Sequence, residues 1–168
     1  MNAPGTDNTL GSYYVGVHEY AVDAQRRVAL PKGWRKGGAE GAHFFLFPGR
    51  KKSLQLVPAQ LFQQLLSKLQ KVSFADEKAA IALASIGMMT QEIFLDKQGR
   101  MAMSADLMCH AGIEDKALMI GSVTTIQIWN PDIWAEKQVS SEAGLDVLQA
   151  IHERPDDISE VLRNVVRG

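Results

Sequence analysis

The chain of 168 residues contains one cysteine, Cys109, and four histidines. A single cysteine excludes an intramolecular disulfide and a zinc site built from several thiolates, and it fits a reducing cytoplasm. Cys109 precedes His110, but adjacent helical residues point about 100° apart, and the apolar neighbours of Cys109 predict a buried, inert thiol. No metal site is expected, because none of the histidines has the spacing of paired ligands: His18, His43, His110 and His152.

Long apolar runs and a phosphate-binding loop are also absent. The longest apolar runs are far shorter than the ~20 residues of a membrane helix. Residues 1–12 are polar, lack the basic start and apolar centre of a secretory signal, and are expected to form a disordered lead-in. Gly37-Gly38 and Gly41 lack the lysine and helix of a P-loop. We therefore expect no catalysis, no cofactor and no small-molecule substrate.

The net charge of −1 argues against a generally basic nucleic-acid binder. The charges are unevenly distributed, however. Residues 1–75 hold ten Lys/Arg against four Asp/Glu, and residues 76–168 hold eight against fifteen. Any positive face is therefore expected on the first half of the chain.

A five-residue motif, Asp-x-x-x-Arg, occurs twice, at Asp23 to Arg27 and at Asp96 to Arg100, 73 residues apart. In the second copy the polar link Asp-Lys-Gln-Gly separates two apolar runs. Asp accepts backbone hydrogen bonds within such a turn, and Gly99 suits a positive φ. The first copy has Arg26 in place of Gly99, which costs about 1 kcal/mol or requires another turn type.

The similarity extends into tandem units at residues 13–73 and 90–139, joined by 74–89 and followed by a helical tail at 140–168. Residues 13–22 are predicted to form a strand with 27–30 as its return partner. The tail has no counterpart in the first unit, and it is expected to pack on the body or to contact another subunit. Further strands are expected at 44–47, 54–57, 115–120 and 125–129, and helices at 58–72, 75–88, 106–111 and, with a candidate break at Ser140-Ser141, from Trp134 to Arg154 and again from Pro155.

These residues resemble the MraZ-type bacterial transcriptional regulators, whose tandem units are of the AbrB-like, swapped-hairpin kind. The resemblance covers residues 13–139 and includes Gly16, seven residues before Asp23, and the closing strand Ile126 to Trp129. It implies an α+β fold, written as a pair of compact β-rich barrels with helices. It also implies a homo-oligomeric ring that binds direct repeats in promoter DNA upstream of division and cell-wall genes, as a cytoplasmic, nucleoid-associated repressor.

The resemblance makes the motif arginines the expected DNA contacts. Arginine presents a rigid donor fork that fits phosphate or the O6/N7 edge of guanine, and the first unit is favoured as the DNA-facing one. Asp23, Asp96 and Gly99 are expected to shape the turns and orient the arginines. The candidate DNA-binding residues are Arg26, Arg27, Lys32, Arg35, Lys97 and Arg100.

Several alternatives stay open at this point. Each motif arginine could pair only with its own Asp, and the run Arg50-Lys51-Lys52 is read as a solvated turn rather than a phosphate clamp. The rival function is a ring-forming structural or interaction module that has lost its operator, in keeping with the altered first motif. Core or interface positions, rather than base-stacking platforms, are expected for the tryptophans Trp34, Trp129 and Trp134.

Overall fold

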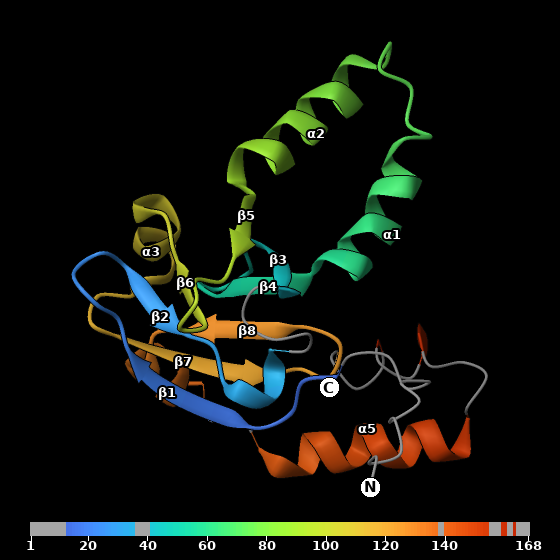
Figure 1. Ribbon diagram of the computed structural model, residues 1–168. Coiled ribbons are helices and arrows are strands. Elements are labelled where there is room, and N and C mark those ends of the chain that lie inside the picture. Colours follow the sequence, from blue (N-terminus) through green and yellow to red (C-terminus); the bar gives the residue numbers. More distant parts are fainter. Residues whose placement is uncertain (1–12, 36–40, 138–139, 155–158, 161–162, 164–168) are drawn as a thin grey trace, which may run out of the picture. The chain divides into compact units, whose positions relative to one another are not determined.

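The computed structural model describes residues 13–35, 41–137, 140–154, 159–160 and 163 (Figure 1). The chain divides into two compact units, Met1–Ile133 and Trp134–Gly168. The expected lead-in at 1–12, the glycines Gly37-Gly38 and the last helix from Pro155 lie outside the described residues.

Both repeats have the same succession of elements in the first unit. Most elements of the second repeat lie 73 residues after those of the first, as the two motifs do. The first repeat contains β1 (Val17–Ala21), β2 (Arg27–Ala29), a 3-10 turn (Lys32–Trp34), β3 (His43–Pro48), β4 (Leu54–Pro58), α1 (Ala59–Leu69) and the linking α2 (Glu77–Met89). The second contains β5 (Gln91–Phe94), β6 (Arg100–Ala102), α3 (Ala105–Ala111), β7 (Lys116–Gly121), β8 (Ile126–Trp129) and α4 (Pro131–Ala135).

The two repeats exchange their first strands. The six-stranded antiparallel sheet has the order β1-β7-β8-β4-β3-β5, so the first strand of each repeat pairs with the third strand of the other. Val17 opposes Ile120 and His43 opposes Phe94, which is the same register in both pairings. The remaining strands, β2 and β6, form a separate two-stranded ribbon. The sheet order is therefore unchanged when the two repeats are interchanged.

This exchange corrects two expectations, although the α+β class with tandem units is confirmed. The strand at residues 13–22 does not pair with 27–30, because β1 pairs with β7 and β2 pairs with β6. The repeats also do not form two separate barrels, since strands from both make one sheet within one unit. A polar turn fixes where the chain reverses, but not which strand completes the sheet.

The core lies where the repeats meet. Val28 and Met101 oppose each other at the centre of the ribbon, and their exposed fractions are 1% and 0%. Tyr14 packs edge-on against Trp34 with ring centroids 6.0 Å apart. The other fully buried large side chains come from both repeats: Leu30, Leu46, Leu54, Leu56, Ile93, Met103, Met119, Ile126 and Ile128.

The predicted helices are present, and their ends follow local rules. Asp76 caps α2 by accepting from the Ala79 N–H at 3.2 Å, and Ser104 caps α3 by accepting from the Leu107 N–H at 3.3 Å. Gly112 ends α3 in the left-handed conformation, with φ of 62°. In the second unit, α5 (Ser141–Glu153) begins at the cap Ser140, which is the candidate break in the helical tail.

One prediction about burial is wrong. Cys109 is exposed, because Leu107, Met108 and Ala111 form the buried face of α3 and Cys109 projects away from it. Trp34 and Trp129 are buried, as expected, whereas Trp134 is half-buried.

Candidate functional site

Turn 1, residues 23–26, is held by the carboxylate of Asp23. The Asp23 N–H donates to the Arg27 carbonyl at 3.0 Å, and the Arg26 N–H donates to the Asp23 carbonyl at 2.9 Å. Oδ1 of Asp23 accepts from the N–H groups of Gln25 and Arg27 at 3.0 and 2.8 Å. Oδ2 accepts from Nε of Arg27 at 2.8 Å. One carboxylate therefore fixes both the turn and the arginine that follows it.

Turn 2, residues 96–99, has the same hydrogen bonds. Oδ1 of Asp96 accepts from the N–H groups of Gln98 and Arg100, both at 2.9 Å. Oδ2 accepts from Nε of Arg100 at 2.8 Å. The Gly99 N–H donates to the Asp96 carbonyl at 2.9 Å, as Arg26 does in turn 1. The two motifs are therefore equivalent in conformation.

The residue before each motif arginine has a positive φ, 59° at Arg26 and 76° at Gly99. Of the two alternatives for turn 1, the structure shows the strained residue rather than a different turn type. Nε of Arg26 donates to the Met103 carbonyl at 3.1 Å. This bond to the other repeat helps offset the backbone strain of about 1 kcal/mol.

Backbone hydrogen bonds are the largest influence on both carboxylates. The N–H of Arg27 lowers the pKa of Asp23, and the N–H of Arg100 lowers the pKa of Asp96, relative to the ordinary value of 3.8. Desolvation opposes this effect, and the guanidinium groups reinforce it. Both carboxylates are therefore ionised at neutral pH, and each neutralises part of its arginine's charge.

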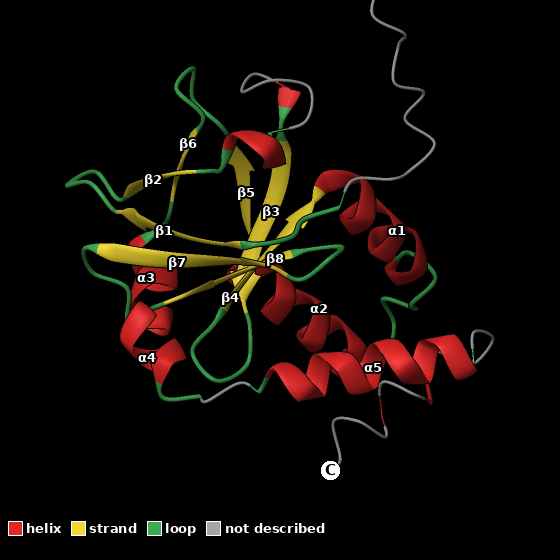
Figure 2. Ribbon diagram, turned by 90° about the horizontal axis from the view of Figure 1, so that it is seen from below, coloured by secondary structure: helices red, strands yellow, loops and turns green. Residues whose placement is uncertain are grey.

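The β2–β6 ribbon brings the two motifs together. Arg27 opposes Ala102 and Ala29 opposes Arg100, so both arginines lie diagonally on the face of the ribbon opposite Val28. Nη1 of Arg100 lies 3.9 Å from Oδ2 of Asp23. The side chains of Arg27 and Arg100 are 35% and 29% exposed. Because the strands are antiparallel, the turns lie at opposite ends of the ribbon, where loops project beside β2 and β6 (Figure 2).

The other candidate residues have different surroundings. Nε of Arg35 donates to the Leu30 carbonyl at 2.6 Å, and Nη1 donates to the Gln98 carbonyl at 3.4 Å. The guanidinium of Arg35 thus occupies the space beside Gly99, where a Cβ would lie 2.6 Å from Nε. Lys32 and Lys97 are exposed.

The sequence analysis missed one residue of this site. Oε1 of Gln25 accepts from Nη2 of Arg27 at 3.2 Å. The signal was present, because Gln25 and Gln98 occupy the same position of the two motifs. By contrast, no local pattern pointed to the contact between Arg35 and turn 2, which joins residues 63 apart.

Two broad classes of site find no support in the part of the chain that the structure describes. It contains no group of three or more His, Cys, Asp or Glu side chains that could hold a metal ion. None of its described helices combines the length and apolar character that a membrane span requires.

Two segments of the chain, residues 14–84 and 86–150, match the model of the MraZ protein family, described as antitoxin-like. The chain belongs to the MraZ family. The two matched segments correspond to the two repeats seen in the structure, so the resemblance inferred from the motifs is confirmed.

Relatives of the MraZ family cover most of the chain. The transcriptional regulator MraZ of Clostridium tetani is 29% identical over 123 residues, which are 73% of this chain and 85% of that protein. The protein of the same name from Clostridium acetobutylicum is 29% identical over 128 residues, 76% of this chain and 89% of its own. The Mycolicibacterium smegmatis protein of that name is also 29% identical, over 129 residues, with coverages of 77% and 89%. These relatives are named as regulators, not as enzymes.

Proposed function

We propose that this chain is a sequence-specific DNA-binding regulator of transcription that acts through its two Asp-x-x-x-Arg turns. The observation that carries the proposal is the ribbon that presents Arg27 and Arg100 together on one partly exposed face. The relatives' names as transcriptional regulators support it.

The chemistry of the turns suits a nucleic acid. A guanidinium has five N–H donors, and the described bonds of Arg27 use one at Nε and one at Nη2. Donors are left for a phosphate or a guanine edge. Asp23 and Asp96 do not contact DNA in this proposal, because phosphates repel carboxylates. They hold the arginines in one conformation, which lowers the entropy lost on binding.

The two turns contribute unequally. Turn 1 carries Arg26 and Arg27, and turn 2 carries Lys97 and Arg100, so we propose turn 1 as the main contact. Lys32 adds charge near the ribbon. Arg35 acts indirectly in this scheme, by bracing turn 2 against Leu30.

The finer parts of the proposal concern assembly and target. The chain acts as a cytoplasmic, nucleoid-associated repressor of a division and cell-wall gene cluster, in a homo-oligomeric ring on direct promoter repeats. A ring presents several identical ribbons, so weak contacts are multiplied through effective concentration. Regularly spaced repeats are the matching ligand, and the low net charge is no obstacle, because only the turns need to be positive.

The test is a titration of Arg27→Ala, Arg100→Ala and wild type against DNA from upstream of the gene and a scrambled fragment, at several salt concentrations. Each loss of a phosphate contact is expected to reduce the slope of log affinity against log salt by about 1 per ribbon. Loss of a base contact costs about 1–3 kcal/mol and relaxes specificity. Arg154→Ala removes one exposed positive charge outside the ribbon and serves as the matched control.

The outcomes separate the two candidate functions. Retained mass by light scattering with lost binding in Arg27→Ala supports the regulator. If Arg27→Ala binds like wild type and Arg100→Ala does not, turn 2 is the main contact. If wild type shows no preference for the upstream fragment while keeping its oligomeric mass, the structural module replaces the regulator.

A further inference from the structure

Helix α2 has the composition of a buried helix but no buried residue. Its sequence, EKAAIALASIGMM, is apolar on nearly every side after the first turn, and no side chain of the helix is buried in the single chain. Ile81 is 63% exposed and Met88 is 87% exposed. A helix that is apolar all round normally lies inside a protein. Another surface is therefore needed to cover α2.

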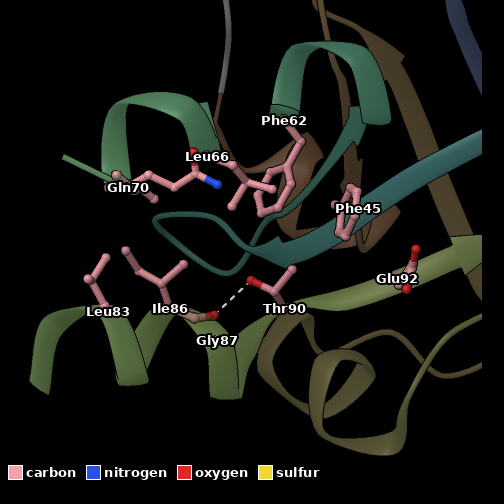
Figure 3. Close-up of a pocket in the computed structure, with 10 residues that line it drawn as sticks. Phe45, Phe62, Leu66, Gln70, Leu83, Ile86, Gly87, Thr90 and Glu92 are labelled. Atoms are coloured by element: carbon pink, nitrogen blue, oxygen red, sulfur yellow. Dashed lines mark hydrogen bonds between the residues drawn. The ribbon is translucent and has the colours of Figure 1, made fainter. Parts of the chain in front are cut away.

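Beside α2 lies an apolar groove. Figure 1 shows α1 and α2 as two separate arms that extend from the sheet, and Figure 3 shows side chains of both pointing into the space between them. The cavity has a volume of about 490 Å³. Stacked rings of Phe45 and Phe62, 4.1 Å apart, lie at one end. The walls are Leu66 and Leu69 from α1 and Leu83 and Ile86 from α2.

Helix α5 has a complementary surface. It too has no buried residue, and Leu145 and Leu148 are 62% and 65% exposed. Residues Val147, Leu148 and Ile151 share one side of the helix, since they are spaced by one, three and four. The polar side carries three carboxylates and no Lys or Arg: Glu142, Asp146 and Glu153.

Charge favours this helix as the occupant of the groove. The segment 59–75, which includes α1, carries Lys68 and Lys71 and no Asp or Glu. Both lysines are exposed. An acidic, amphipathic helix therefore matches the basic, apolar arm in both charge and polarity.

We propose that α5 of one copy docks in the α1–α2 groove of a neighbouring copy. The contact is heterologous, because different surfaces of the two copies meet, and a repeated heterologous contact closes into a ring. Docking within one chain would satisfy both surfaces in a monomer and leave nothing to build the ring. The inference rests on the self-association in the proposed function, and it does not depend on DNA binding.

The test uses two full-length variants that break opposite sides of the contact. Leu66→Glu places a charge in the groove, and Leu148→Glu places one on the apolar side of α5. Leu65→Glu and Gln149→Glu are matched controls, because each lies beside the altered residue, and neither Leu65 nor Gln149 lines the groove. All four positions are exposed, so the fold is expected to persist.

Light scattering of the variants alone and mixed gives the decisive result. Each groove or helix variant is expected to fall from the oligomeric mass to that of one copy, while the controls keep the wild-type mass. An equimolar mixture retains one intact groove and one intact helix per pair, so it forms a species of two copies and nothing larger.

Three results would overturn the proposal. If both variants keep the wild-type mass, copies associate through another surface. If the mixture forms no two-copy species, α5 does not reach a neighbour and docks on its own chain or elsewhere. If wild type is already a single copy, the proposed self-association fails too. Binding of a fragment with one operator repeat is expected to persist in every variant, which keeps the DNA proposal separate.

Discussion

Substitution of Gly99 by alanine should destabilise the protein more than its backbone conformation alone predicts. Gly99 has φ of 76°, a region where an L-residue costs about 1 kcal/mol. In addition, the new Cβ would lie 2.6 Å from Nε of Arg35 and would displace its guanidinium. Arg35 would then lose its bonds to the carbonyls of Leu30 and Gln98.

The expected magnitude follows from these two contributions. Charge-assisted hydrogen bonds are worth about 1.5–3 kcal/mol each when well formed, but the Arg35–Gln98 bond is long at 3.4 Å and exposed. We expect about 1–2 kcal/mol from Arg35, and a total of about 2–3 kcal/mol for Gly99→Ala. In an Arg35→Ala background, Gly99→Ala should cost only the backbone contribution of about 1 kcal/mol.

The free energy of unfolding in urea, at one fixed protomer concentration, measures this double-mutant cycle. Gly112→Ala is the matched control, because Gly112 also has a positive φ of 62° but its Cβ would meet only Ile133 Cδ1 at 3.4 Å and Asn130 Nδ2 at 3.9 Å. It should cost about 1 kcal/mol. Equal costs of Gly99→Ala with and without Arg35 would refute the brace.

Three further predictions test the carboxylates, the core and a helix end. Because the folded pKa of Asp96 lies below 3.8, its contribution to stability is present above that pH and is lost as pH falls through the folded pKa; acid unfolding of Asp96→Asn should therefore show a weaker pH dependence below about pH 4, and an unchanged profile would contradict the assignment. Met101→Ala removes a side chain with no exposed area and should cost about 2–5 kcal/mol in urea unfolding, whereas less than about 1 kcal/mol would mean that the ribbon does not form the core. Ser104→Ala removes the α3 cap and should cost about 0.5–2 kcal/mol, with Ser104→Asp as the conservative variant that retains the stability.

The sequence predicted the elements that depend on neighbouring residues. The turns, the helices α1 and α2, and the end of α3 at Gly112 are all determined within a few positions along the chain. The same local signals serve a hairpin that pairs with itself and one that exchanges strands. The partner of β1 lies about 100 residues away, and no motif specifies it.

The site was predictable to a similar extent. Asp23 and Arg27 follow from the repeated motif, and Gln25 could have been found by the same comparison. Arg35 could not, because its partners are backbone carbonyls, which have no sequence identity to recognise. The exposure of Cys109 was predictable in principle, since the short stripe of Leu107, Met108 and Ala111 already excludes it from the buried face.

The exchange of strands also sets a timetable for the nascent chain. β1 (residues 17–21) can complete its pairing only when β7 (residues 116–121) has been made. At synthesis rates of about 5–20 residues per second, that interval lasts on the order of 5–20 s. During it, the edge of β1 has no native partner and is open to pairing with another chain. The N-terminal half of the protein therefore depends on its C-terminal half before either can leave the ribosome safely folded.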